Sequence, residues 1–345
     1  MRKNIYVLTL AIASVVLSVP AVCASKKTAP ESPVRGENTA LGPAVLWRNP
    51  DDIASRDLFY GPGGEKHQPQ GPFTFVKEDL DGTNPKFDVR DGNDVKWKVK
   101  LGEEARPETV ATRLVWAAGY FADEDYFLPD MQVAEMPRRL QRGQKLVGPD
   151  GSVHNVRLKR HVKGEEKLGN WQWRLDSFTN TRELNGLRVA MALINNWDLK
   201  DENNKVLEYE HKEEGPEQIY EVSDLGASFG TTGRHRSRAV SKGSLQSYSR
   251  SQFITKVTPE FVDFKTPGRP SFVLIVNPRE YISRVHLEWI GKHIPRGDAR
   301  WLGELLARLS PEQIRAAFRA AGYSPQEIEG FSKVVEGRIA ELTQL

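Results

Sequence analysis

The sequence predicts an α+β fold in which a small antiparallel β-rich lobe is followed by a mainly helical lobe. Two observations indicate this order. Three short segments with alternating apolar residues, separated by turn sequences, lie within residues 73–101. From residue 301 onward, apolar residues instead recur at helical spacing, and Ser-Pro pairs mark helix starts. We divide the 345 residues into a signal peptide (1–24), a linker or arm (25–69), the β-rich lobe (70–160) and the helical lobe with its tail (161–345).

The N-terminus has the composition of an export signal. Arg2 and Lys3 precede an apolar run over residues 5–22. Small residues on either side of Cys23 allow cleavage before Ser25. We therefore expect an exported protein, periplasmic or secreted, with no membrane span after signal removal, because no second apolar run reaches about 18 residues. An uncleaved anchor and a lipoprotein attached at Cys23 are the alternatives.

Composition excludes several classes of site and partner. Cys23 is the only cysteine, so a cleaved protein would contain no disulfide and no cysteine-based metal or catalytic site. The net charge of +3 becomes +1 when Arg2 and Lys3 are removed. Such a small charge argues against a nucleic-acid partner bound by bulk electrostatics. The mature length of about 320 residues suits one two-lobed domain or two small domains.

An arm without sustained apolar periodicity leads into the β-rich lobe. Residues 25–69 are rich in Pro, Gly, Lys and Glu, which predicts a loosely attached segment. Strands are predicted over residues 73–76, 86–89 and 95–101, with a loop over 79–85 and a tight turn at 91–94. Two more strands are predicted over 121–127 and 131–135 around a Pro129-Asp130 turn, followed by a hinge at Met136-Pro137 and a hairpin into 153–158.

A helix is predicted after the third strand, beginning near Pro107. It carries Glu108 in its first turn, so a strand lysine and a helix glutamate are placed where they can pair. Lys100 fits this pair best, because the sequence Trp-Lys-Val-Lys that it ends is similar to the Val-Ala-Ile-Lys strand motif. Lys98 shares the face of Lys100 and is the alternative.

The helical lobe begins with a buried helix that starts at a capping-box-like sequence, residues 180–183, and leads into Asn-Trp-Asp, ending at Asp198. Asn203 follows five residues later, and Asp224 comes further on, within Asp-Leu-Gly. A phosphotransferase needs one carboxylate to orient the nucleophile, and an amide and a second carboxylate to hold metal on the nucleotide phosphates. The other predicted elements are a hairpin (205–209 and 218–222), an Arg-rich segment at 234–238 that is either a solvated loop or faces substrate or phosphate, and tail helices at 301–309, 310–322 and 324–339.

With Lys100, Glu108, Asp198, Asn203 and Asp224 in that order, the chain resembles the protein-kinase-like superfamily. The resemblance covers roughly residues 70–340 and is closest to the atypical branch, which includes HipA-type, CotH-type and secretory-pathway kinases. The Asn-Trp-Asp sequence looks like the Asn-x-Asp catalytic loop of that branch rather than His-Arg-Asp.

This resemblance implies a two-lobed kinase-like fold that uses ATP, or another nucleotide, and Mg²⁺. Asp198 would orient the acceptor hydroxyl, and Asn203 and Asp224 would bind Mg²⁺. Lys100 would contact the nucleotide phosphates, with Glu108 holding it in position.

The chain departs from the family pattern in three places. Gly82 is the only glycine in the loop that would cover the phosphates, so the covering would be weaker or differently shaped. The short separation between Lys100 and Glu108 leaves Glu103 or Glu104 as possible pairing partners. Leucine replaces the phenylalanine of Asp-Phe-Gly, which leaves the metal-binding and turn-forming residues in place.

Three functions are compatible with the sequence. The first is an exported phosphotransferase that moves a phosphoryl group from a nucleotide to an unknown protein, glycan or small-molecule acceptor. The second is a catalytically silent relative that acts as a binding or scaffold protein of the cell envelope. The third is an unrelated α+β binding protein. Nucleotide binding with and without magnesium would separate them.

Overall fold

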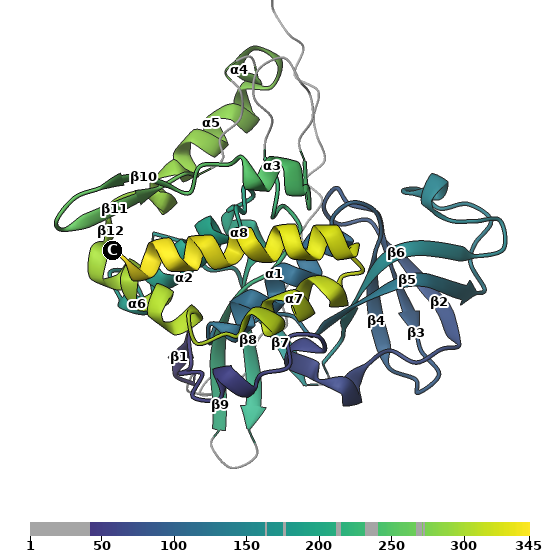
Figure 1. Cartoon of the computed structure of the whole chain (residues 1–345). Helices are drawn as coiled ribbons and strands as arrows, with labels where there is room; N and C mark the ends of the chain where they lie inside the picture. The colour runs from purple at the N-terminus through teal and green to yellow at the C-terminus, as the bar shows by residue number, and fades with distance from the viewer. Residues whose placement is uncertain are drawn as a thin grey trace, which may run out of the picture. The chain divides into compact units, whose positions relative to one another are not determined.

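The computed structural model describes residues 42–162, 164–174, 177–211, 215–231, 241–266, 271 and 273–345, which lie in one compact unit of the chain. The predicted signal peptide and the Arg-rich residues 234–238 fall outside the described residues. The described chain mixes antiparallel sheets with helices, so the predicted α+β fold is confirmed (Figure 1).

The β-rich part is a five-stranded closed barrel with the strand order β2-β3-β4-β6-β5. Its strands are β2 (Phe73–Asp79), β3 (Lys86–Arg90), β4 (Lys96–Lys100), β5 (Asp125–Ala134) and β6 (Ser152–Arg160). Neighbouring strands are antiparallel, except for the short parallel contact between β2 and β5 that closes the barrel. Successive side chains of a strand point to opposite faces. Phe87, Val89, Trp97 and Val99 therefore fill the interior, while the lysines between them face outward.

The predicted turn at Pro129-Asp130 and the predicted hinge at Met136-Pro137 are wrong. β5 runs through Pro129 as one strand, because β6 pairs with it on both sides of the proline, from Asp125 to Gln132. Proline has no amide hydrogen, but the flanking pairs hold the backbone extended. After β5 the chain returns to the barrel as β6, so it leaves the barrel after Arg160.

The helix α1 (Ala105–Ala117) follows β4, as predicted, and starts two residues before Pro107. It ends at Ala117, and Gly119 follows with a φ of +89°, which favours a residue without a side chain. α1 lies against β5 and β6 on the outside of the barrel, and nearly all of its side chains are buried. The outward face of the barrel is therefore partly covered by a helix that brings its own charged residues.

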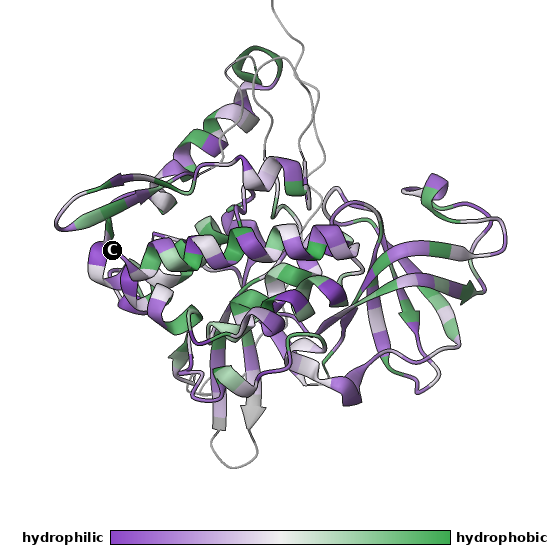
Figure 2. Cartoon of the chain, viewed as in Figure 1, coloured by the Kyte–Doolittle hydropathy of each residue, from purple (hydrophilic) through white to green (hydrophobic). Residues whose placement is uncertain are grey.

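The helical part contains α2 (Arg182–Leu193), α3 (Leu245–Ser249), α4 (Val273–Val276), α5 (Pro278–Leu287), α6 (Arg296–Leu306), α7 (Pro311–Ala320) and α8 (Pro325–Thr343). The predicted tail helices are confirmed, and α7 and α8 begin with the capping boxes of Ser310 and Ser324. Apolar and polar residues alternate along α8, the long yellow helix of Figure 1, which packs on α6 and α7 (Figure 2). Each helix in the described part of the chain is too short or too polar to cross a lipid bilayer.

Two small sheets complete the helical part. One has the order β1-β9-β8-β7, and the other has the order β10-β11-β12. Their strands are β1 (Ala44–Val45), β7 (Glu165–Gly169), β8 (Asn204–His211), β9 (Gly215–Val222), β10 (Ile254–Val257), β11 (Phe261–Phe264) and β12 (Ile294–Pro295). The predicted hairpin is confirmed as β8–β9, with strands longer than expected. Short 3₁₀ helices are η1 (Ile53–Ser55), η2 (Gly61–Gly63), η3 (Glu65–His67), η4 (Gln144–Leu146), η5 (Asp201–Asn203) and η6 (Glu288–Gly291).

The expectation of a loosely attached arm is wrong for residues 42–69. Leu46, Ile53 and Leu58 are buried in the main core, and β1 adds a parallel strand to β9. These three buried side chains fix the segment on a core that is formed by residues distant in the sequence, so the local pattern gives no sign of the contact.

Candidate functional site

The candidate site is centred on the ammonium group of Lys100, at the end of β4. Its Nζ lies 2.7 Å from Glu108 Oε2, 3.2 Å from Glu104 Oε2 and 2.6 Å from Asp224 Oδ1. Burial lowers the pKa of Lys100, but the charges of Glu108, Asp224 and Glu104 outweigh it and hold the pKa well above the usual value. The lysine is therefore a fixed cation that joins the barrel, α1 and the segment after β9.

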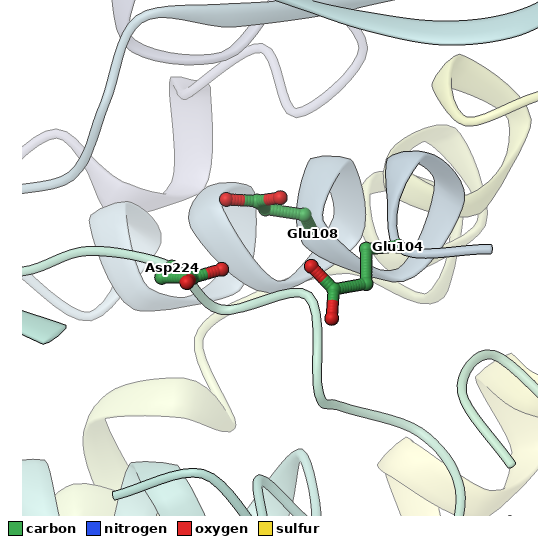
Figure 3. Close-up of side chains that lie close together, drawn as sticks. All are labelled: Glu104, Glu108 and Asp224. Atoms are coloured by element: carbon green, nitrogen blue, oxygen red, sulfur yellow. The ribbon is translucent and has the colours of Figure 1, made fainter. Parts of the chain in front are cut away.

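The three carboxylates converge because two separate segments approach closely (Figure 3). Glu104 directly precedes α1 and Glu108 lies in its first turn, whereas Asp224 comes from the segment that follows β9. A side chain at Gly226 would place its Cβ 2.6 Å from Glu104 Cβ, so glycine is required for this approach. Asp224 itself has a φ of +55°, which points to a tightly constrained turn.

These carboxylates also form the candidate metal centre of the described residues. One oxygen from each of Glu104, Glu108 and Asp224 lies within 4.8 Å of the others. Carboxylate oxygens suit Mg²⁺, but here Lys100 contacts all three groups and offsets their charge. Asp224 is the most open, with 43% of its side chain exposed, against 8% for Glu104 and 1% for Glu108.

Glu108 is the better-fixed partner of Lys100, as the sequence suggested. Arg157, on the outward face of β6, pairs with the other Glu108 oxygen and lies 3.9 Å from Asp125. Asp125 in turn pairs with Arg113 of α1 at 2.7 Å. All of these side chains are almost completely buried. The network locks α1 to the barrel and fixes the Glu108 carboxylate.

The alternative partners behave differently. Glu104 contacts Lys100 and is also bound by Lys242 and by the amide of Asn84. Burial raises the pKa of Glu104, but Lys100 and Lys242 more than offset this and lower it overall. Glu103 is exposed at the start of α1. Glu104 is thus a second carboxylate partner of Lys100 beside Glu108, and its ion pair with Lys242 holds the segment containing Lys242 at the same site.

Lys98 and Gly82 lie on the same side of the barrel as Lys100. The Lys98 ammonium pairs with Asp79, at the end of β2, and lies 3.4 Å from Asp88. Gly82 lies in the loop between β2 and β3, where its φ is +64°. The structure therefore gives Lys98 its own carboxylate partners, separate from those that hold Lys100.

Asp198 lies on the loop after α2, where its carboxylate is ion-paired. Arg284 Nη1, from α5, lies 2.7 Å from Asp198 Oδ1, and Lys200 Nζ lies 3.6 Å away. The amide side chain of Asn203 donates to the Asp198 carbonyl oxygen at 2.7 Å. Asn196 Oδ1 accepts a hydrogen bond from the Asp198 backbone N–H at 2.8 Å. These bonds hold the loop in a closed turn.

Asn203 connects this loop to the segment that carries Asp224. The backbone N–H and the hydroxyl of Ser223 both donate to the Asn203 carbonyl oxygen, at 2.9 and 3.0 Å. Asn203 therefore lies beside the residue that precedes Asp224. The structure brings the Asp198 loop, Asn203 and Asp224 into one region, although the three are spread over 27 positions of the sequence.

Sequence reasoning missed four charged residues of this region: Lys86, Arg157, Lys242 and Arg284. The sequence carries a signal for Arg157, because this charged residue lies between the apolar residues Val156 and Leu158 of β6, all three of which are buried. Arg284 and Lys242 had none, since only the folded chain brings them to their carboxylates.

No protein-family model matches the chain, and no curated protein matches it. A solved structure that is similar in fold is that of the Helicobacter pylori proinflammatory kinase CtkA. The two are 12% identical in sequence, with a TM-score of 0.41, and the similar region covers 79% of this chain and 96% of the CtkA chain. A likeness at this level says nothing about activity.

Proposed function

We propose that the chain is a kinase-like phosphotransferase, which moves a phosphoryl group from a nucleotide to a hydroxyl acceptor. One observation carries the proposal. Lys100, on a strand of the barrel, is held by Glu108 of the following helix and reaches Asp224 of an Asp-x-Gly sequence. A lysine fixed by a helix glutamate, beside a metal-binding aspartate, is the arrangement by which kinases bind nucleotide phosphates.

Each residue has a defined part in this proposal. Lys100 would bind phosphate oxygens, and Glu108 would keep its ammonium in place. Asp224 and the amide oxygen of Asn203 are hard oxygen donors of the kind that Mg²⁺ prefers, and bound Mg²⁺ would offset the charge of the phosphates. Asp198 would orient the acceptor hydroxyl and take its proton, as the acceptor oxygen bonds to phosphorus and the bond to the leaving nucleoside diphosphate breaks.

The charged partners of the two aspartates support a second function, that of a catalytically silent binding or scaffold protein. Asp224 contacts Lys100, and Asp198 contacts Arg284, both at ion-pair distance. Each aspartate must exchange or share its cation before it can serve a metal or an acceptor. If both ion pairs persist when a nucleotide is bound, the protein binds the nucleotide without transferring its phosphoryl group.

Nucleotide titrations with and without magnesium test the proposal. Asp224→Asn removes a negative ligand and should weaken magnesium-dependent binding at least tenfold, about 1.4 kcal/mol, and abolish transfer. Asp198→Asn should leave binding intact and suppress only transfer, measured as release of the nucleoside diphosphate. Asp94→Asn, at an exposed turn, is the matched control and should change neither. Absence of nucleotide binding by the unmodified chain under both conditions would refute a phosphotransferase; binding without diphosphate release would favour the silent protein.

A further inference from the structure

The outward face of the barrel beside Lys100 is built from charged residues. Cross-strand neighbours in the β3–β4–β6 register form two rows: Lys86, Lys100 and Arg157 in one, and Asp88, Lys98 and Lys159 in the other. Neighbours in register project from the same face of a sheet. The intervening residues Phe87, Val99 and Leu158 point into the barrel core. All six side chains in these two rows are therefore charged.

The second row is occupied by ion pairs. The buried Asp88 carboxylate lies 2.9 Å from Lys96 Nζ and 3.4 Å from Lys98 Nζ, with His161 Nε2 at 3.7 Å. Lys98 also pairs with Asp79. A flat apolar ligand placed against this row would have to displace or bury these charges unpaired, which is strongly unfavourable.

The ion pairs continue from the barrel to the sheet of the helical part. Lys159, at the end of the second row, pairs with the buried Asp123. Lys205 of β8 lies 3.3 Å from Asp123 and 3.3 Å from Glu221 of β9. The region between β6 and the β8–β9 hairpin is thus filled by charged side chains that satisfy one another. An aromatic base is held by apolar or aromatic surfaces, whereas the described side chains here are mainly paired charges, with the Tyr209 hydroxyl beside Glu165.

The first row differs at Lys86, whose ion pair with Asp79 is long, whereas Lys100 and Arg157 are held by closer carboxylates. Lys86 lies directly across from Lys100, and its nearest carboxylate oxygen among its ion pairs is that of Asp79, at 3.8 Å. Burial lowers the pKa of Lys86; the charges of Asp79 and Asp224 oppose this, while those of Lys98 and Lys100 add to it, so the pKa is lowered overall. A Cβ at Gly82 would lie 3.9 Å from Lys86 Nζ, so this ammonium lies against the loop that would cover the phosphates. Lys86 therefore places a positive charge beside the loop over residues 79–85, which has only Gly82 as a glycine.

We propose that this site recognises a phosphate chain and makes no use of a nucleotide base, with Lys86 as a second phosphate-binding residue beside Lys100. The proposal rests on the phosphotransferase function above and names its donor class: inorganic polyphosphates should serve as well as nucleoside triphosphates. Charge-assisted hydrogen bonds from two lysines suit phosphate oxygens, whereas the neighbouring ion pairs give a base no apolar surface.

Calorimetric titration of the full chain with four ligands at constant magnesium and ionic strength tests this inference. ATP, GTP and inorganic tripolyphosphate should bind with dissociation constants within threefold of one another, and adenosine should not bind. Tripolyphosphate binding ten times more weakly than ATP, or adenosine binding by itself, would overturn the inference and leave the proposed function standing. Absence of binding by ATP, GTP and tripolyphosphate alike would overturn both.

Substitutions of Lys86 provide a second, independent readout. Lys86→Ala should weaken ATP and tripolyphosphate by the same factor, about tenfold, because it removes a contact to phosphate alone. Lys86→Arg keeps the charge and should restore most of the affinity. Lys256→Ala, at an exposed position of β10, is the control and should bind as the unmodified chain does. Unchanged affinity in Lys86→Ala, or an effect on ATP only, would contradict the assignment of Lys86.

Discussion

The Glu108 carboxylate joins two buried cations, so replacing it with glutamine isolates the contribution of its charge. Its side chain is 1% exposed, and it pairs with Lys100 at 2.7 Å and with Arg157. In Glu108→Gln, Lys100 keeps Glu104 and Asp224, but Arg157 keeps only Asp125, at 3.9 Å, among its ion-pair partners. The substitution therefore leaves Arg157 as the poorly compensated charge.

Removal of one partner from a buried ion pair typically costs 3–5 kcal/mol. The carboxylates that remain around Lys100 offset part of this, so we expect Glu108→Gln to lower the free energy of unfolding by about 3 kcal/mol. Arg157→Met by itself should also be destabilising, because Glu108 then loses one of its two cations. The double variant should lose at least about 1 kcal/mol less than the sum of the single variants, because the two residues interact directly.

Urea unfolding followed by tryptophan fluorescence measures these differences, provided that the slope with denaturant is unchanged. The control is Glu329→Gln, which breaks the exposed ion pair with Arg315 and should leave the free energy of unfolding nearly unchanged. If Glu108→Gln is as mild as this control, or if the double variant is simply additive, Glu108 does not hold the buried network together.

Two further predictions concern pH and processing. Burial raises the pKa of Asp88, but His161, Lys96 and Lys98 outweigh it and hold the pKa well below the usual value of about 3.9. Ionised Asp88 therefore stabilises the fold above about pH 4, and this contribution is lost as the pH falls further. Between pH 6 and pH 3, the free energy of unfolding measured in urea should fall more in the unmodified chain than in Asp88→Asn. Equal decreases in the two proteins would contradict this prediction. We also propose that the chain is exported, so N-terminal sequencing of the mature protein should begin near Ser25, and an intact N-terminus in the cytosol would argue against export.

Local sequence patterns predicted much of the fold because the interactions behind them are local. Alternation of apolar residues predicted the first three barrel strands, and the Ser310 and Ser324 capping boxes fixed the starts of α7 and α8, since a cap and its helix lie within four residues. The order of Lys100 and Glu108 likewise predicted an ion pair that the structure contains. Their roles in phosphate binding remain predictions.

Other features were decided by tertiary structure, because they depend on partners distant in sequence. Pro129 looks like a turn residue, but the length of the β5–β6 pairing keeps it within a strand. The nearer of the two cations at Asp198 is Arg284, 86 positions away, and nothing in the local pattern around either residue signals this contact. Local patterns in the sequence therefore predicted the first barrel strands, the tail helices and the order of the polar site residues. Only long-range packing decided which charges neutralise one another, because ion pairing depends on distance in space and carries no sequence periodicity.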